Sequence, residues 1–215
     1  MKQSILIIFS VLFLSACATE KNIPLQESFW QQKHHKVAVA SVKPAKPGVT
    51  MVVSQGILDY AINSAMTNKL DTHLSRTNLS WYYSLPTDMA LKLKEHQISA
   101  VNAGSDMSDD ERQVANIAAE HHVDDVLVIK LQAVGVIRRY SGFIPTGSPE
   151  AYSVLKGELI DTSSKSVKWR HLAEVKLPVQ GEWDQPPTFP NVTKAVNEAI
   201  NVSRQEILDS FFSGH

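Results

Sequence analysis

Apolar residues along this chain occur in short runs and in helical stripes. The run Val37–Val42 ends before Pro44 and predicts a buried first strand, whereas apolar residues recurring every three to five positions over 51–76 predict a long amphipathic helix. The domain is therefore expected to begin near Lys36 with a strand followed by a helix. The apolar stripe of that helix consists of Val53, Ile57, Leu58, Ala61, Ile62, Ala65, Met66, Leu70 and Leu74.

Turn and capping signals divide the rest of the chain. Ser108 and Glu111 have the spacing of a capping box at a helix start, and the polar turn Thr162–Lys165 separates two strands. The segment Ser141–Pro149 carries two glycines and two prolines and predicts a connection, as does the segment around Gly104. The predicted elements are strand 37–42, helix 51–76, strand 79–85, helix 89–96, helix 108–122, strand 125–140, strands 151–161 and 166–177, and helix 192–212.

This order predicts one α/β (α+β) domain over residues 36–215. Early alternation of strand and helix makes the first strands parallel, and hairpins make the later ones antiparallel. We expect a mixed parallel/antiparallel sheet of about five strands with helices packed on it. Residues 17–35 show no period and predict a lipidated amino terminus and tether, with Phe29 and Trp30 as candidates for docking on the domain.

The first 16 residues predict a targeting signal that is not part of the fold. Lys2 precedes an apolar stretch too short for a comfortable membrane span, and Leu14-Ser15-Ala16-Cys17 resembles the lipobox of bacterial lipoproteins. The resemblance implies diacylglycerol on the Cys17 sulfur, cleavage before Cys17, and an N-acyl chain such as palmitate, with no other cofactor. Ala18 implies sorting to the outer membrane, with the domain facing the periplasm. A plain secretory signal or an uncleaved membrane helix is the alternative.

Composition removes several classes of function. Lys and Arg number 21 against 22 Asp and Glu, and no long basic run occurs, so we expect no nucleic-acid partner. Cys17 is the single cysteine, so no structural disulfide forms and no thiol is left for catalysis once the sulfur is lipidated. No second apolar segment approaches the roughly 18 residues that span a bilayer.

Beyond the amino terminus, the chain resembles envelope lipoproteins with an anticodon-binding-domain-like α/β fold, a group that includes the TolB amino-terminal domain, CsgG and LpoB. In such families a strand ends in an aspartate, a polar turn follows, and a tryptophan lies on the return strand. Asp161 is accordingly expected to bond turn amides in an Asx-type arrangement, and Trp169 to bury its ring under the hairpin. The resemblance rests on Cys17, strand 37–42 with the helix after it, His122–Ile129, and Gly157–Asp161 leading to Lys165 and Trp169.

Candidate catalytic and metal-binding residues are few. Neither His34-His35 nor His121-His122 forms a ready chelate, because adjacent side chains diverge in a helix and in a strand, so we expect no metal site. The pairs Asp109-Asp110 and Asp124-Asp125 fall at element edges, where capping and solvation explain them. No nucleophile elbow, phosphate loop or dinucleotide fingerprint occurs, so we predict no catalytic residue.

The turn after strand 125–140 is the best candidate for a partner contact. It places two guanidinium groups, a phenol and two apolar side chains on a segment expected to be exposed. These residues are Arg138, Arg139, Tyr140, Phe143 and Ile144. In the alternative, Phe143 and Ile144 fold back over the sheet edge. For the Pro-rich segment 183–190, a rigid connection is favoured over a partner-bound polyproline segment.

Together these observations predict a non-enzymatic outer-membrane lipoprotein whose periplasmic domain is a protein-binding or scaffolding module of an envelope complex, with a partner that the sequence does not name. A second hypothesis is a homo-oligomeric secretion channel similar to CsgG, whose long hairpin could come only from residues 126–160. A third is an envelope hydrolase.

Overall fold

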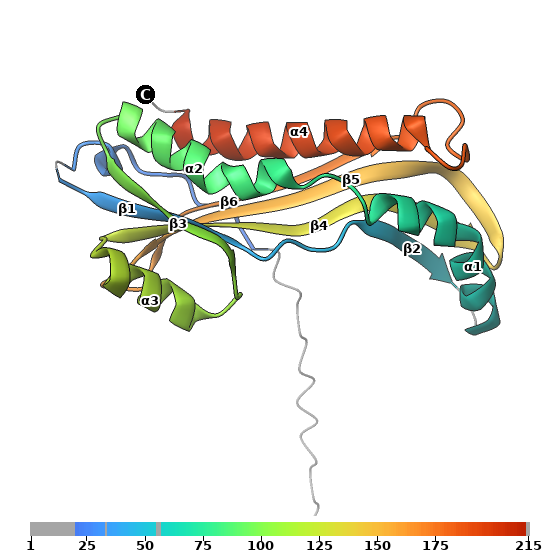
Figure 1. The fold of residues 1–215 in the computed structure, drawn as a ribbon, viewed down its shortest axis with the longest axis horizontal. Helices are drawn as coiled ribbons and strands as arrows, with labels where there is room; N and C mark the ends of the chain where they lie inside the picture. Colours follow the sequence, from blue (N-terminus) through green and yellow to red (C-terminus); the bar gives the residue numbers. More distant parts are fainter. Residues whose placement is uncertain (1–19, 33, 55–56, 214–215) are drawn as a thin grey trace, which may run out of the picture.

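The computed structural model describes residues 20–32, 34–54 and 57–213. They form an elongated, six-stranded mixed sheet with α2 and α4 on one face and α3 on the other (Figure 1). The predicted α/β class with a mixed parallel and antiparallel sheet is confirmed. The elements are η1 (Glu27–Phe29), β1 (Lys36–Val42), β2 (Gly48–Ser54), α1 (Ile57–Leu74), α2 (Ser80–Glu95), β3 (Ser99–Met107), α3 (Glu111–His121), β4 (Asp125–Ser141), β5 (Ile144–Asp161), β6 (Val167–Pro178) and α4 (Pro190–Phe212).

Strand β4 is long enough to pair with two strands in succession along one edge. The sheet order is β3-β1-β4-β5-β6, and β2 also lies beside β4. β1 runs parallel to the first part of β4, from Val37 opposite Asp125, and β2 runs parallel to its last part, from Gly48 opposite Gly135. The antiparallel hairpins β4–β5 and β5–β6 complete the sheet.

The hydroxyl group of Tyr82 on α2 closes the gap between β1 and β2. Its Oη lies 2.6 Å from the carbonyl oxygen of Val42 and 3.0 Å from that of Ile129, and it accepts a hydrogen bond from the backbone N–H of Leu131 at 3.2 Å. The side chain is fully buried, and burial raises the pKa of the phenol to about 12. Backbone groups at the break in strand pairing are thus satisfied by a helix side chain.

The β5–β6 hairpin confirms both predictions made for it. Asp161 Oδ1 accepts hydrogen bonds from the backbone N–H groups of Ser163 and Ser164 at 3.0 and 2.8 Å. The Lys168 ammonium, 2.7 Å from Oδ2, and these turn donors hold the pKa of the Asp161 carboxyl well below its usual range. Trp169 is fully buried, and its ring meets Phe211 of α4 edge to face at 4.8 Å.

Two predicted elements in the first half differ from the structure: the first helix is confirmed but begins later, and one strand is wrong. The helix expected over 51–76 begins only at Ile57, because Gly48–Ser54 pairs with β4 as a strand. The strand expected over 79–85 is the first half of α2. Its buried residues follow a helical spacing that continues past Pro86, and they are Tyr82, Leu85, Pro86, Met89, Ala90 and Leu93.

Three further predictions in the middle of the chain also differ from the structure. The segment expected as a loop around Gly104 is β3, which runs parallel to β1. The cap of α3 is Asp110 and not Ser108, since the Asp110 carboxylate accepts from Arg112 N at 2.9 Å. The connection expected over 141–149 is a tight turn, with Ser141 paired to Ile144 and Gly142 at a φ of 62°.

The amino-terminal segment is not the free tether that the sequence predicted, at least from Glu20 onward. Phe29 docks as expected: it is buried in the core, and its ring lies 6.0 Å from that of Phe211. Ile23 pairs with Arg170 of β6. The signal segment and Cys17 lie outside the described residues. In the described part of the chain, no helix is long and apolar enough to cross a membrane.

Candidate functional site

Helix α1 buries polar residues and exposes apolar ones over residues 58–67. Asn63 and Thr67 are buried, whereas Leu58 is 73% and Met66 60% exposed. Only the second half of the helix has an apolar inner side. The inward face consists of Asn63, Thr67, Leu70 and Leu74, at spacings of four, three and four residues.

The tip of the β4–β5 hairpin is fastened to α1. Asn63 Nδ2 donates a hydrogen bond to the carbonyl oxygen of Gly142 at 3.0 Å. The next two residues, Phe143 and Ile144, are 59% and 58% exposed, so the prediction of exposure is confirmed for them and the alternative of folding back is wrong. Arg139 is exposed as well and pairs with Glu150 at 2.5 Å.

The expectation of an exposed turn is wrong for Arg138 and Tyr140. Both side chains are buried, and Arg138 is only 2% exposed. The Arg138 guanidinium stacks over the Trp183 ring, 3.9 Å from its centroid, and lies 5.7 Å from the centroid of Tyr140. Alternation along the strand turns Arg139 outward and its two neighbours inward. Trp183 thereby fastens the connection between β6 and α4 to β4.

The helix α1, the strand β2 and the β4–β5 turn lie at one end of the molecule (Figure 1), and each carries exposed apolar side chains. We call this set the distal surface. It was not predicted as a site, because an apolar stripe on an amphipathic helix was expected to face the core. One feature of the sequence could have indicated this surface. The helix face that contains Leu70 and Leu74 carries the polar residues Asn63 and Thr67 two turns and one turn earlier. The distal surface consists of Val52, Leu58, Tyr60, Ile62, Met66, Phe143 and Ile144.

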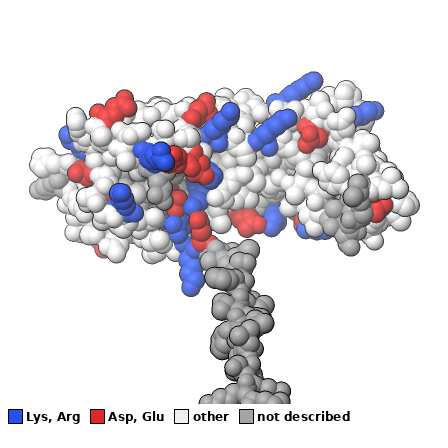
Figure 2. All heavy atoms as spheres, turned by 90° about the horizontal axis from the view of Figure 1, so that it is seen from below, with Lys and Arg blue, Asp and Glu red and all other residues white. Residues whose placement is uncertain are grey.

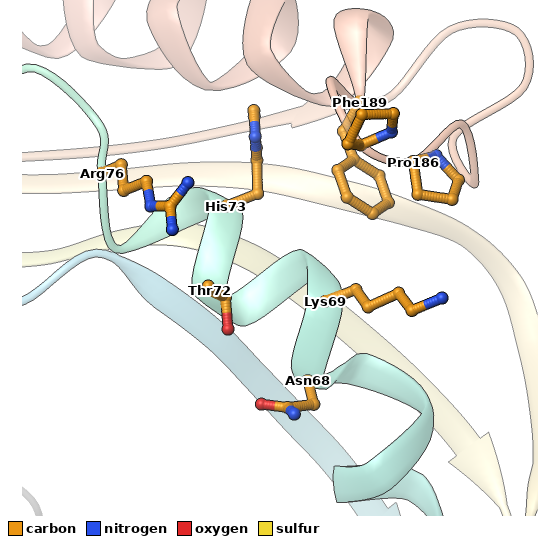
Figure 3. Close-up of a pocket in the computed structure, with 8 residues that line it drawn as sticks. Asn68, Lys69, Thr72, His73, Arg76, Pro186 and Phe189 are labelled. Atoms are coloured by element: carbon orange, nitrogen blue, oxygen red, sulfur yellow. The ribbon is translucent and has the colours of Figure 1, made fainter.

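A groove between α1 and the connection 183–189 adjoins the distal surface (Figure 3). Its first hollow has a volume of about 480 Å³ and its second about 330 Å³. Met66 belongs both to the distal surface and to the lining of the second hollow, together with Trp183. The first hollow is lined by Asn68, Lys69, Thr72, His73, Arg76, Pro186, Pro187 and Phe189.

The groove carries two cations and one carboxylate. Lys69 lies on α1 and Arg76 lies in the turn just after it, and no ion pair joins either one to another described residue. Asp184 lines the second hollow. His73 is engaged within the fold, since its Nε2 lies 2.8 Å from Thr193 Oγ1 of α4. The groove therefore offers positive charge beside apolar surface.

A buried cluster of titratable groups lies elsewhere and stabilises the fold. His35 Nε2 is 2.5 Å from Asp125 Oδ2, and Lys168 Nζ is 2.7 Å from both Asp125 Oδ1 and Asp161 Oδ2. Burial acts to lower the pKa of Lys168, but the two carboxylates raise it. Asp125 is fully buried, and these contacts join the beginnings of β1, β4 and β6 to the end of β5. Neither hollow of the groove reaches the cluster.

Within the described ranges, no group of three or more His, Cys, Asp and Glu side chains is placed to hold a metal ion. His34 is at a φ of 72°, outside the strand that follows, and His122 ends α3 in the left-handed conformation. The two histidine pairs therefore lie at element ends.

No protein-family model matches the chain, and no curated protein matches it. Its similarities are to solved structures, and they include a bacterial lipoprotein. Lipoprotein GNA1162 from Neisseria meningitidis is 12% identical over 77% of this chain and 98% of that chain, with a TM-score of 0.36. The hypothetical protein CT253 from Chlamydia trachomatis is 10% identical over 80% of this chain and 94% of that chain, with a TM-score of 0.39. The LpoB C-terminal domain from Salmonella enterica is 9% identical over 69% of this chain and 90% of that chain, with a TM-score of 0.25. These TM-scores are low, so the likenesses carry no argument about function.

Proposed function

We propose that this chain is an outer-membrane lipoprotein, anchored through Cys17, whose periplasmic domain binds another envelope protein through the distal surface. It acts by binding and not by catalysis. The observation that carries the proposal is the inverted helix α1, which turns Leu58, Tyr60 and Met66 outward while it buries Asn63 and Thr67. The lipobox-like sequence ending in Cys17 supports the anchor.

Burial of the distal surface would contribute favourable free energy to a contact with a partner. Single exposed apolar residues are normal on proteins, but a set gathered at one end is typical of an interaction site. Full burial of one large apolar side chain contributes about 1.5–3 kcal/mol, so covering Leu58 and Met66 would contribute at most about 3–6 kcal/mol before the cost of association. Tyr60, Phe143 and Ile144 would add to this.

The groove specifies the chemistry of the partner. Lys69 and Arg76 provide cations without an ion-pair partner among the described residues, and Lys69 lines the second hollow together with the apolar side chain of Met66. Complementary charge favours a partner segment that carries Asp or Glu beside apolar residues. We therefore assign the surface to an apolar, acidic segment of another envelope protein.

Site-specific photo-crosslinking in intact cells tests this proposal. A photoreactive amino acid at Tyr60 should give one reproducible adduct with another protein. The adduct should be lost in the double variant Leu58→Ser/Met66→Ser and weakened severalfold in Lys69→Glu/Arg76→Glu. Leu91→Ser is the matched control, because Leu91 is an apolar residue of α2 that is 53% exposed and lies outside the distal surface.

The outcomes separate the alternatives. An adduct between two copies of this chain would show that the surface serves self-assembly and would overturn the assignment to another protein. An adduct that persists in Leu58→Ser/Met66→Ser, with the circular dichroism of the variants unchanged, would show that the distal surface is not the site. Absence of any adduct from Tyr60 and from Phe143 would count against the binding function itself.

A further inference from the structure

The first described residues are hydrogen-bonded to β6, the strand at the edge of the sheet. Ile23 and Arg170 exchange two backbone hydrogen bonds, with N···O distances of 2.8 and 2.9 Å. The backbone N–H of Leu172 donates to Asn22 Oδ1 at 2.9 Å. The chain is therefore fixed to β6 within a few residues of Cys17.

Glu20 adds an ionic contact to this attachment. Its Oε2 lies 2.5 Å from Lys156 Nζ and 4.0 Å from Arg170 Nε, and Lys156 holds the pKa of Glu20 below its usual value. Lys156 stands directly opposite Lys130 across the β4–β5 pair, an arrangement of like charges that is unfavourable by itself. Asp109 pairs with Lys130, and Glu20 and Glu158 both pair with Lys156, so Glu20 is one of the carboxylates that offset this repulsion.

The contact between Glu20 and Lys156 identifies one face of the sheet. Leu155 and Leu159 are core residues on the side that α4 covers, so Lys156 between them points to the opposite face. α3 packs on this opposite face through Ile117. Figure 2, which views the molecule from the side away from α2 and α4, shows basic and acidic side chains lying next to one another near the middle of this face.

We infer that the bilayer lies against this face, which we call the anchor face. The inference rests on the proposed lipidation of Cys17. Only three residue steps separate Cys17 from Glu20, and a fully extended chain covers at most about 3.6 Å per residue, or about 11 Å in all. The anchor face is formed by α3 and by the outward side chains of β4, β5 and β6.

This orientation has a consequence for the proposed partner site. The strands run along the longest dimension of the molecule, and α2 and α4 lie on the side away from the anchor face (Figure 1). The long axis is therefore parallel to the bilayer, with α2 and α4 turned to the periplasm. The distal surface then lies at one end of this axis, where it meets partners held in or on the same membrane.

Cysteine reactivity in liposomes tests the orientation. Since Cys17 is the single cysteine, and its sulfur carries the lipid under this proposal, an introduced cysteine would be the one free thiol. Glu174→Cys places a thiol on the exposed anchor side of β6, and Glu198→Cys places one on the exposed side of α4. In the lipidated protein, a bulky maleimide should react severalfold more slowly at Glu174→Cys than in the unlipidated Cys17→Ala form. The rate at Glu198→Cys should be the same in both forms.

A linker insertion provides the matched control. Ten Gly and Ser residues between Thr19 and Glu20 keep the anchor but add a flexible spacer of about 18 Å root-mean-square length. The protection of Glu174→Cys should then disappear. Mass spectrometry of Cys17 separates the two ways of failing: no lipid on Cys17 overturns the anchoring and the orientation together. A lipidated protein with equal rates at both positions, without the linker, overturns the orientation alone.

Discussion

Substitution of Gly157 by alanine should destabilise the fold through a single steric conflict. A Cβ built on Gly157 would lie 2.5 Å from two ring carbons of Trp169, Cη2 and Cζ3, and 3.4 Å from Ile129 Cδ1. The indole cannot move aside freely. It is fully buried, meets Phe211 edge to face at 4.8 Å, and its Nε1 donates to Ser210 Oγ at 3.3 Å.

The expected magnitude follows from two opposing contributions. Overpacking of a well-packed core by one methyl group costs about 1–3 kcal/mol. Replacement of glycine by alanine offsets part of this cost, because it removes about 0.4–1 kcal/mol of conformational entropy from the unfolded chain. The net loss for Gly157→Ala should be about 1–2 kcal/mol. For a domain of this size, that corresponds to a decrease in Tm of about 2–8 °C.

Urea denaturation of the unlipidated Cys17→Ala form, followed by far-UV circular dichroism, measures this loss. Trp169→Phe provides the test of cause, because a smaller ring leaves a cavity beside glycine but room for the alanine methyl group. The double variant Gly157→Ala/Trp169→Phe should therefore be less destabilised than the sum of the single variants. A Gly157→Ala protein as stable as the parent, or strictly additive losses, would refute the steric reasoning.

Two further predictions concern stability. Tyr82→Phe should cost about 1–3 kcal/mol in urea denaturation, because it leaves buried backbone groups at Val42 and Leu131 without a partner; an unchanged midpoint would contradict this. Asp161→Asn should lower stability near neutral pH, where the contact with Lys168 is ionised. Because the pKa of Asp161 is lowered in the fold, its contribution is present above the ordinary value of about 3.9 and is lost as pH falls below it. The stability difference between parent and variant should therefore narrow in acid, and a constant difference from pH 7 to pH 3 would contradict the ionic account.

The segments that local pattern predicted correctly are those whose own residues carry a clear pattern. β1 is a run of buried apolar residues, the β5–β6 hairpin combines strand residues with a polar turn anchored by Asp161, and α4 has a continuous apolar stripe. β3 was missed because most of its residues are exposed, so no buried apolar run marks it as a strand. β2 pairs with β4, about 90 positions away, and nothing within residues 48–54 reports that partner. The helical pattern immediately after β2 was therefore extended over it.

The candidate site shows the same limit more clearly. Phe143 and Ile144 could be predicted as exposed, since a turn between two strands must reach the surface. The burial of Arg138 could not be predicted, because its stacking partner Trp183 is brought beside it only by the fold. Likewise, periodicity shows that α1 has an apolar stripe but not which side the sheet covers. The sheet covers the side of Asn63, whose amide holds the hairpin tip.

The anchor and the distal surface are joined by one strand, and this fixes the distance between them. Lys156, which holds Glu20, and Ile144, at the distal surface, both belong to β5 and are 12 residues apart. At about 3.4 Å per residue, the strand separates them by about 40 Å. β4 pairs with β5 on one side, with two register shifts, and β6 pairs with β5 on the other side from Glu150 onward, so the separation is set by the sheet and not by a flexible tether. The proposed partner segment should accordingly meet this protein about 40 Å from its point of membrane attachment, measured along the bilayer.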